Sequence, residues 1–157
     1  MSSDLGRGAH ALLRIAAGLL FLQHGLQKLF GFFGGIQGST VPLLSQLGFA
    51  GILETAGGLF LIIGLFTRPV AALLIAEMIA AYFIAHAPQG TWPIQNQGEL
   101  ALLYASIFAF LAANGAGPLS MDEVLPAHRA GDRRRTADRR YDADRRHVSD
   151  RRHPVAA

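Results

Sequence analysis

The sequence predicts an all-α protein, a four-helix transmembrane bundle with a disordered C-terminal tail. Three observations support this fold class. Hydrophobic residues make up 51% of the 157 residues, and the mean hydropathy is +0.31. Residues 1–127 contain only four Lys and Arg, whereas residues 128–157 contain ten Arg. Apolar runs recur four times before the tail, while a soluble domain would spread its charge over the whole surface.

Four segments are predicted to cross the bilayer, at about residues 9–33, 49–66, 69–85 and 98–113. A spanning helix needs about 20 mostly apolar residues, so the last two segments are short and should tilt little. Glycine or proline marks the end of the first and fourth segments and the start of the third. We therefore expect a transmembrane domain over residues 1–125 and a separate tail over residues 126–157.

The cations predict the orientation of the bundle. Arg7 precedes the first segment, Arg68 lies between the second and third, and the ten Arg follow the fourth. The connections at residues 34–48 and 87–97 contain no Lys or Arg. Basic flanks stay in the cytoplasm. The prediction is a multi-pass protein with both termini cytoplasmic.

The tail repeats Asp-Arg-Arg every six residues, starting at Asp132, Asp138, Asp144 and Asp150. Residues 128–157 hold ten Arg and five Asp, a net charge of +5. A period of six fits neither a helical stripe nor a packed core, so the prediction is a disordered, solvated segment. The alternative is attraction to anionic lipid headgroups, worth about 1 kcal/mol per Arg near the surface. The interspersed Asp and the membrane tether argue against nucleic-acid binding.

Several kinds of site are excluded or unsupported. The chain has no cysteine, which excludes disulfides, zinc–thiolate sites and cysteine-ligated iron–sulfur clusters. No helix carries two His at ligand spacing, so no metal site is predicted. The glycines at 34 and 35 lack the pattern of a phosphate-binding loop. No catalytic residue can be named from these patterns.

Ionisable side chains inside the predicted spans are costly, and such groups tend to be paired or functional. Counting 1.5 Å per residue sorts them into two layers. The inner layer predicts a structural ion pair between Arg14 and Glu77. The outer layer gathers the candidates for ligand binding or proton relay, which are His24, Lys28, Glu54 and Glu99. The alternative for the outer layer is a purely structural network.

Helical periodicity places these charges on the glycine faces of their helices. At about 100° per residue, Arg14, Gly18, Gly25 and Lys28 lie near one line. In the second segment, Glu54 likewise lies on the helical face that carries Gly51 and Gly58. Small residues mark close helix approach in lipid, so these charges should point into the bundle. The stripe Ala72, Ala76 and Ala80 predicts a packing face on the third segment.

The chain also resembles a known family, the DoxX membrane proteins. The resemblance rests on residues 14–25, on Lys28–Gly31, on Gly64–Pro69 and on Gly115–Asp122, in order and at natural spacing. It covers roughly residues 10–122 and leaves out the Arg-rich tail. The motif residues that recur here are Arg14, His24, Gly25, Lys28, Glu54, Arg68 and Glu99.

The resemblance implies a four-helix protein of the bacterial inner (plasma) membrane. Some members are described as parts of membrane oxidoreductase complexes, and the family name comes from a quinone-linked context. The leading hypothesis is therefore a subunit of a membrane redox system, with a redox partner protein and a quinone headgroup at the outer layer. Whether the chain is itself an enzyme stays open. The alternatives are a protein that binds or transports a small amphiphile and a structural subunit without catalysis.

Overall fold

The computed structural model describes residues 2–125, which form helices joined by loops. The predicted tail at residues 126–157 lies outside the described residues. Four long helices make up the fold: α1 (Ser2–Phe30), α2 (Gln46–Ile63), α3 (Thr67–Ala81) and α5 (Glu99–Asn114). The short elements are η1 (Phe32–Gly34), η2 (Tyr82–His86), η3 (Ala87–Gln89), α4 (Pro93–Asn96) and α6 (Met121–Val124).

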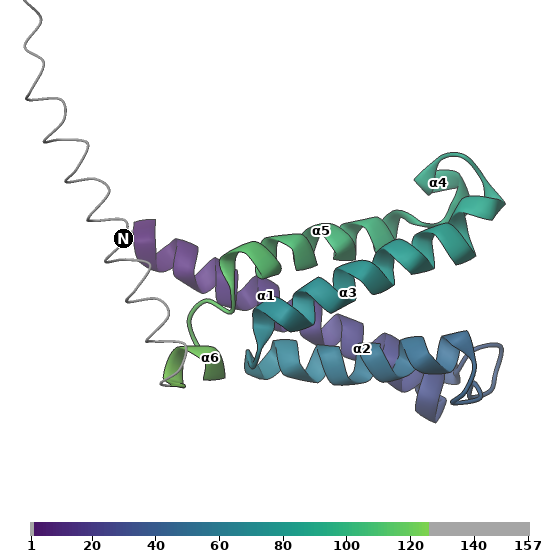
Figure 1. Cartoon of the computed structure of the whole chain (residues 1–157), viewed down its shortest axis with the longest axis horizontal. Helices are drawn as coiled ribbons and strands as arrows, with labels where there is room; N and C mark the ends of the chain where they lie inside the picture. Colours follow the sequence, from purple (N-terminus) through teal and green to yellow (C-terminus); the bar gives the residue numbers. More distant parts are fainter. Residues whose placement is uncertain (1, 126–157) are drawn as a thin grey trace, which may run out of the picture. The chain divides into compact units, whose positions relative to one another are not determined.

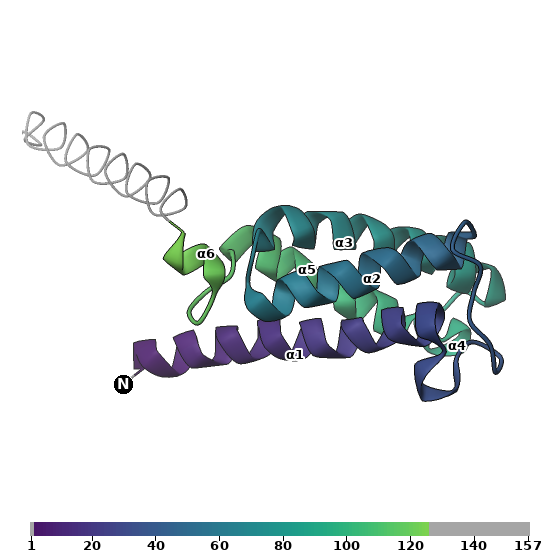
Figure 2. The same cartoon turned by 90° about the horizontal axis from the view of Figure 1, so that it is seen from below.

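The four long helices run alternately up and down (Figures 1 and 2). The most extensive helix–helix interfaces are those between α1 and α2 and between α3 and α5, and α2 also packs on α3. We call the end with residues 31–45 and 87–98 the loop end. We call the end with the 64–66 turn and residues 115–120 the terminal end, because α1 begins there. The predicted four-helix bundle is confirmed.

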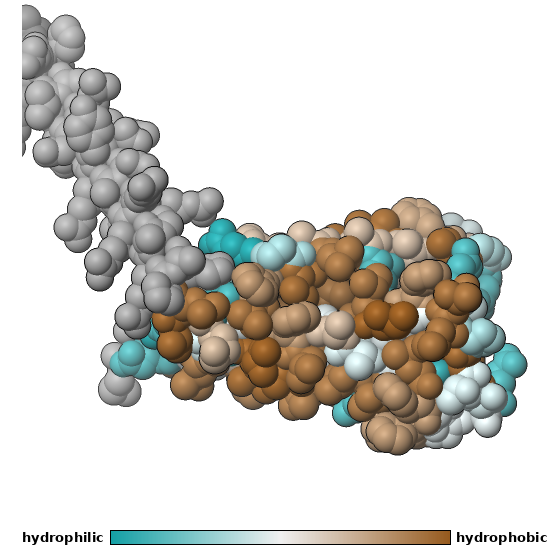
Figure 3. All heavy atoms as spheres, turned by 60° about the horizontal axis from the view of Figure 1, so that its bottom comes forward, coloured by the Kyte–Doolittle hydropathy of each residue, from teal (hydrophilic) through white to brown (hydrophobic). Residues whose placement is uncertain are grey.

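The surface of this bundle is suited to lipid. Three helical stretches are long and apolar enough to cross a membrane, namely Asp4–Phe30, Gln46–Ile63 and Thr67–Gln89, and the apolar helix Glu99–Asn114 is shorter. Each of the four carries exposed leucines, for example Leu19, Leu59, Leu73 and Leu103. Hydrophobic side chains cover most of the face shown in Figure 3. Soluble proteins rarely expose such an extended apolar surface, so these helices span a membrane.

The third span is longer than the sequence predicts. It begins at Thr67 rather than at Pro69, and it continues beyond Ala81 through the π-helical turn η2 and the 3₁₀ turn η3. A π-helical turn contains one extra residue and changes the direction of the side chains that follow it. His86 ends this turn, and its Nδ1 lies 3.0 Å from the carbonyl oxygen of Asn96.

The glycine faces of the first two helices point into the bundle, as predicted, and they pack against each other. A Cβ on Gly18 would lie 2.9 Å from the carbonyl oxygen of Gly58, and a Cβ on Gly58 would lie 2.8 Å from that of Gly18. Nearer the loop end, Gly25 abuts the backbone of Thr55 in the same way. The two backbones therefore touch along one line, as small residues in a lipid-embedded interface permit.

The alanine stripe predicted as a packing face on the third helix is wrong, because Ala72, Ala76 and Ala80 are exposed. The helix instead buries the neighbouring face, with Ala71, Leu74 and Met78. The helix is hydrophobic all round, so small residues alone did not identify its buried side.

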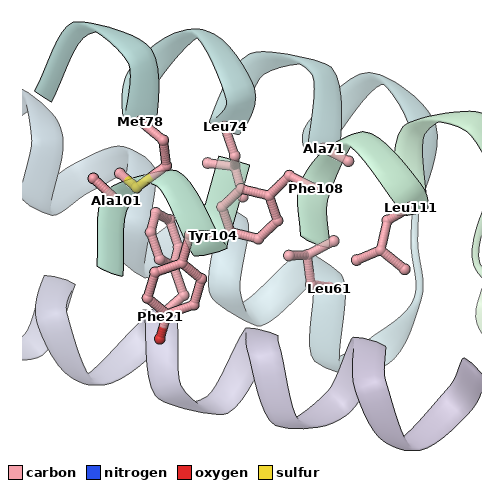
Figure 4. Close-up of a cluster of buried hydrophobic side chains, with 9 residues drawn as sticks. All are labelled: Phe21, Leu61, Ala71, Leu74, Met78, Ala101, Tyr104, Phe108 and Leu111. Atoms are coloured by element: carbon pink, nitrogen blue, oxygen red, sulfur yellow. The ribbon is translucent and has the colours of Figure 1, made fainter. Parts of the chain in front are cut away.

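An apolar core fills the middle of the bundle (Figure 4). Phe21 of α1 meets Phe108 of α5 edge to face, with ring centroids 4.9 Å apart. Leu61, Leu74 and Leu111 are fully buried beside them. This core separates two polar groups of side chains, one toward each end of the bundle.

Candidate functional site

The polar group toward the terminal end is built around Arg14, which is fully buried. Its Nη1 donates to the carbonyl oxygens of Leu61 (2.7 Å) and Ile62 (2.9 Å) at the end of α2. Its Nη2 donates to those of Pro118 (3.2 Å) and Leu119 (2.8 Å). The last carbonyls of a helix lack partners within the helix and carry the negative end of its dipole, so a guanidinium satisfies both needs.

The predicted ion pair between Arg14 and Glu77 is not formed, and this prediction is wrong. Both carboxylate oxygens of Glu77 are buried without a hydrogen-bond partner among the described residues. The physical reason is depth. Arg14 contacts the end of α2, next to the start of α3 at Thr67, whereas Glu77 lies ten residues along α3, about 15 Å away.

At the same end lie two of the sequence motifs, residues 64–69 and residues 115–122, and the structure shows what they do. Gly64 ends α2 in the left-handed conformation, with φ 68°, and the amide of Leu65 donates to the carbonyl of Phe60 at 3.0 Å. The carboxylate of Asp122 accepts from the amides of Phe66 (2.8 Å) and Thr67 (2.9 Å) and so caps α3. These residues connect the ends of the helices by hydrogen bonds, and we assign them a structural role.

The polar group on the loop-end side of the core is the candidate site. Lys28 of α1 donates to both carboxylate oxygens of Glu54 of α2. The two side chains are only 15% and 6% exposed, so this ion pair is shielded from the surroundings. A charge in hydrocarbon is tolerated when it is paired and hydrogen-bonded, and each of these charges meets that condition through the other.

Two further protonatable side chains lie beside this pair. His24 is one turn before Lys28 on α1, close enough for their charges to interact. The His24 ring meets the Tyr104 ring of α5 edge to face, at 6.1 Å between centroids. Tyr104 is buried, reaches toward α1 beside Phe21 in Figure 4, and interacts with the charge of Glu54.

Glu77 brings the third helix into this site. A Cβ on Gly57 of α2 would touch Leu74 of α3, which fixes the register of the two antiparallel helices. Glu54 lies three residues from Gly57 and Glu77 three residues from Leu74, both toward the loop end, so the two acids lie at one level. The charges of Glu54 and Lys28 both act on Glu77. We call these side chains the polar cluster, and its members are His24, Lys28, Glu54, Glu77 and Tyr104.

The structure does not bring Glu99 into the polar cluster. Glu99 is exposed at the first position of α5. It lies about 140° around that helix from Tyr104, since five residues separate them. His24, Lys28 and Glu54 do come together, as the glycine faces indicated.

Sequence reasoning missed Tyr104 and placed Glu77 in the wrong layer. For Tyr104 a signal was available, since the tyrosine shares one face of its helix with Ala101, Phe108 and Leu111, all of which are buried. For Glu77 the sequence held no equivalent signal. Its depth depends on where α3 begins and on the contact between Gly57 and Leu74.

The donor set of the polar cluster suits a polar headgroup more than a metal ion. Among residues 2–125, no group of three or more His, Cys, Asp or Glu side chains could hold a metal. The cluster instead offers an imidazole, an ammonium, a phenol and a carboxyl group directly beside the aromatic core. Such a combination offers hydrogen-bond donors to the oxygens of a polar ring and apolar neighbours to its faces. The arrangement could also relay a proton between neighbouring groups.

Comparison with known proteins gives both a family and relatives. A family model described as DoxX matches residues 9–87. An uncharacterized protein of Haemophilus influenzae is 41% identical over 119 residues, which cover 71% of this chain and 87% of the relative. "Inner membrane protein YphA" of Escherichia coli K12 is 30% identical over 132 residues, covering 76% and 94%.

A third relative is named for an activity. "Putative oxidoreductase CatD" of Bacillus subtilis 168 is 30% identical over 113 residues, which cover 71% of this chain and 82% of the relative. No solved structure matches the fold significantly.

Proposed function

This chain belongs to the DoxX family of membrane proteins, and from that premise we propose that it is a subunit of a membrane-associated oxidoreductase system that binds a quinone headgroup. In this proposal the headgroup binds at the polar cluster. His24 donates or accepts a proton, and the ion pair of Lys28 and Glu54 orients the ring. In this proposal, electrons come from a redox partner protein or from the substrate.

The observation that carries the proposal is the gathering of protonatable side chains from all four long helices at one level. Lys28 and Glu54 already neutralise each other's charge. The imidazole, the phenol and the second carboxyl group of the cluster are therefore more than charge neutralisation requires. Groups of this kind in a water-poor site are typical of functional sites. The relative named as an oxidoreductase supports the choice of redox chemistry.

The test is quinone binding by the purified full-length protein in detergent. Lipid-soluble molecules that co-purify are extracted and analysed for quinones. Binding of a short-chain ubiquinone and a short-chain menaquinone is then measured by calorimetry. We expect His24→Ala and Glu54→Gln each to weaken binding of one of these quinones about tenfold, since each removes a polar contact worth about 1.4 kcal/mol.

Matched controls separate binding from folding. Gln23→Ala changes an exposed residue that directly precedes His24, and Asp4→Asn neutralises an exposed carboxylate on the same helix. Both should bind quinone like the wild type. If His24→Ala and Glu54→Gln lower thermal stability and neither quinone binds the wild-type protein, the cluster is structural and the proposal is wrong. Solute uptake into vesicles would favour the transport alternative instead.

The location and the tail are part of the same proposal. The protein would lie in the inner membrane of a bacterial cell with both termini in the cytoplasm. Support comes from the distribution of basic residues and from the relative named as an inner membrane protein. The Arg-rich residues 128–157 would then face the anionic lipids of the cytoplasmic leaflet.

A further inference from the structure

Glu77 is the member of the polar cluster that the proposed quinone site does not yet explain. Its two carboxylate oxygens are buried, and neither has a hydrogen-bond partner among residues 2–125. A buried polar group without a partner costs free energy, and a buried unpaired charge costs far more. Something other than the described side chains must therefore compensate this carboxyl group.

The charges around Glu77 do not supply that compensation. The charges of Lys28 on α1 and Glu54 on α2 act on Glu77. The other two members of the cluster, His24 and Tyr104, interact with Lys28 and with Glu54, respectively. The ammonium of Lys28 is already bound to both oxygens of Glu54. A second cation at His24, next to Lys28, would be unfavourable. An ionised Glu77 would thus leave one uncompensated negative charge beside Glu54.

Two buried carboxyl groups beside a single cation behave as a coupled pair that retains one proton. The hydrogen bonds from Lys28 hold Glu54 in its ionised form, so the proton belongs on the other acid. A protonated carboxyl group is a hydrogen-bond donor, and in this position it has no acceptor among the described residues. A ligand with a carbonyl oxygen would provide one.

We propose that Glu77 holds the exchangeable proton of the polar cluster and donates it, as a hydrogen bond, to a carbonyl oxygen of the bound ligand. This inference rests on the proposed quinone site and deepens it. It assigns the recognition of one quinone oxygen to α3, opposite the ion pair of α1 and α2.

Infrared spectroscopy of the full-length protein in lipid tests the proton without any ligand. We expect the carbonyl band of a protonated carboxylic acid at neutral pH in the wild type. The band should disappear in Glu77→Gln and persist in Asp4→Asn, whose carboxylate is exposed. A wild type without the band, or a Glu77→Gln variant that keeps it, would overturn the inference. Glu77→Gln preserves size and replaces the carboxyl group with an amide that does not titrate, and thermal unfolding checks that it folds.

The pH dependence of short-chain quinone binding tests the hydrogen bond. Binding by the wild type should weaken about tenfold at alkaline pH, where Glu77 loses its proton and with it one hydrogen bond. Glu77→Gln keeps an N–H donor that does not titrate, so its affinity should lose this dependence. Glu77→Leu, which has no donor, should bind about tenfold more weakly at every pH.

The two proposals fail in different ways. If quinone binds and Glu77→Gln retains the wild-type pH profile, the inference is wrong while the quinone site stands. If neither quinone binds the wild type but the infrared band depends on Glu77, the proposed function and the ligand contact are wrong. In that case the placement of the proton on Glu77 stands.

Discussion

At the scale of single residues, Arg14 and Lys28 represent two solutions to the same problem. Each is a cation within a membrane-spanning helix. Lys28 is neutralised by a carboxylate, whereas Arg14 donates to four backbone carbonyl oxygens from two segments of the chain. A planar guanidinium with several donors can satisfy such a set, and a lysine ammonium cannot span it. The polar atoms of Arg14 therefore stabilise the fold, while those of Lys28 remain beside the candidate site.

This difference predicts the effect of exchanging the two kinds of cation. Arg14→Lys should lower the free energy of unfolding by about 2 to 4 kcal/mol, because at least two hydrogen bonds from a charged donor are lost. Thermal unfolding in detergent measures the effect. Arg68→Lys, an exposed position, is the matched control and should change stability by less than about 0.5 kcal/mol. Equal losses in both variants would contradict the role of the Arg14 network.

The sequence could predict that Arg14, Lys28 and Glu54 point inward, because each shares a helical face with glycines. It could not predict the partner of Arg14. The acceptors are backbone carbonyls 47 and 104 residues away along the chain, and a carbonyl is present at every position. From residue types alone, the only partner that can be recognised for an arginine is a carboxylate on another helix.

At the scale of elements, α1 and α2 depend on the missing side chains of their glycines. Gly58→Ala should destabilise the protein by about 1 to 3 kcal/mol, since its Cβ would overlap the backbone of Gly18 and Leu22. Chemical or thermal unfolding in detergent checks this. Gly8→Ala on α1 provides the control, because nothing lies within 4 Å of its Cβ. That change should be neutral or stabilise by up to about 1 kcal/mol through helix propensity. A larger loss of stability in Gly8→Ala than in Gly58→Ala would contradict the role of the α1–α2 contact.

The helix ends were harder to predict than the helices themselves. Asp122 caps α3 from a position more than 50 residues later in the sequence, and this moves the start of the helix to Thr67. At its other end the π-helical turn Tyr82–His86 and the 3₁₀ turn Ala87–Gln89 carry the span beyond the predicted boundary at residue 85. Both shifts are set by tertiary contacts or local backbone geometry. The level of Glu77 with Glu54 follows from the contact between Gly57 and Leu74, which is likewise a tertiary contact.

At the scale of the whole molecule, the absence of native cysteine allows the orientation to be tested directly. Ser39→Cys lies in the connection between α1 and α2, and Ser149→Cys lies in the Arg-rich tail. A membrane-impermeant maleimide added to spheroplasts should label the first variant. It should label the second only after permeabilisation, because basic segments remain cytoplasmic. Labelling of Ser149→Cys in intact spheroplasts would contradict the predicted topology.

The network around Arg14 also sets an order of assembly during biosynthesis. The ribosome delivers α1 to the membrane long before Pro118 and Leu119 have been synthesised, since 104 and 105 residues separate them from Arg14. Until then two of its four acceptors do not exist, and α3 lacks the cap from Asp122. Until that segment is synthesised, the guanidinium of Arg14 in the first helix has only two of its four acceptors. The segment that follows α5 is therefore the one that completes the bundle.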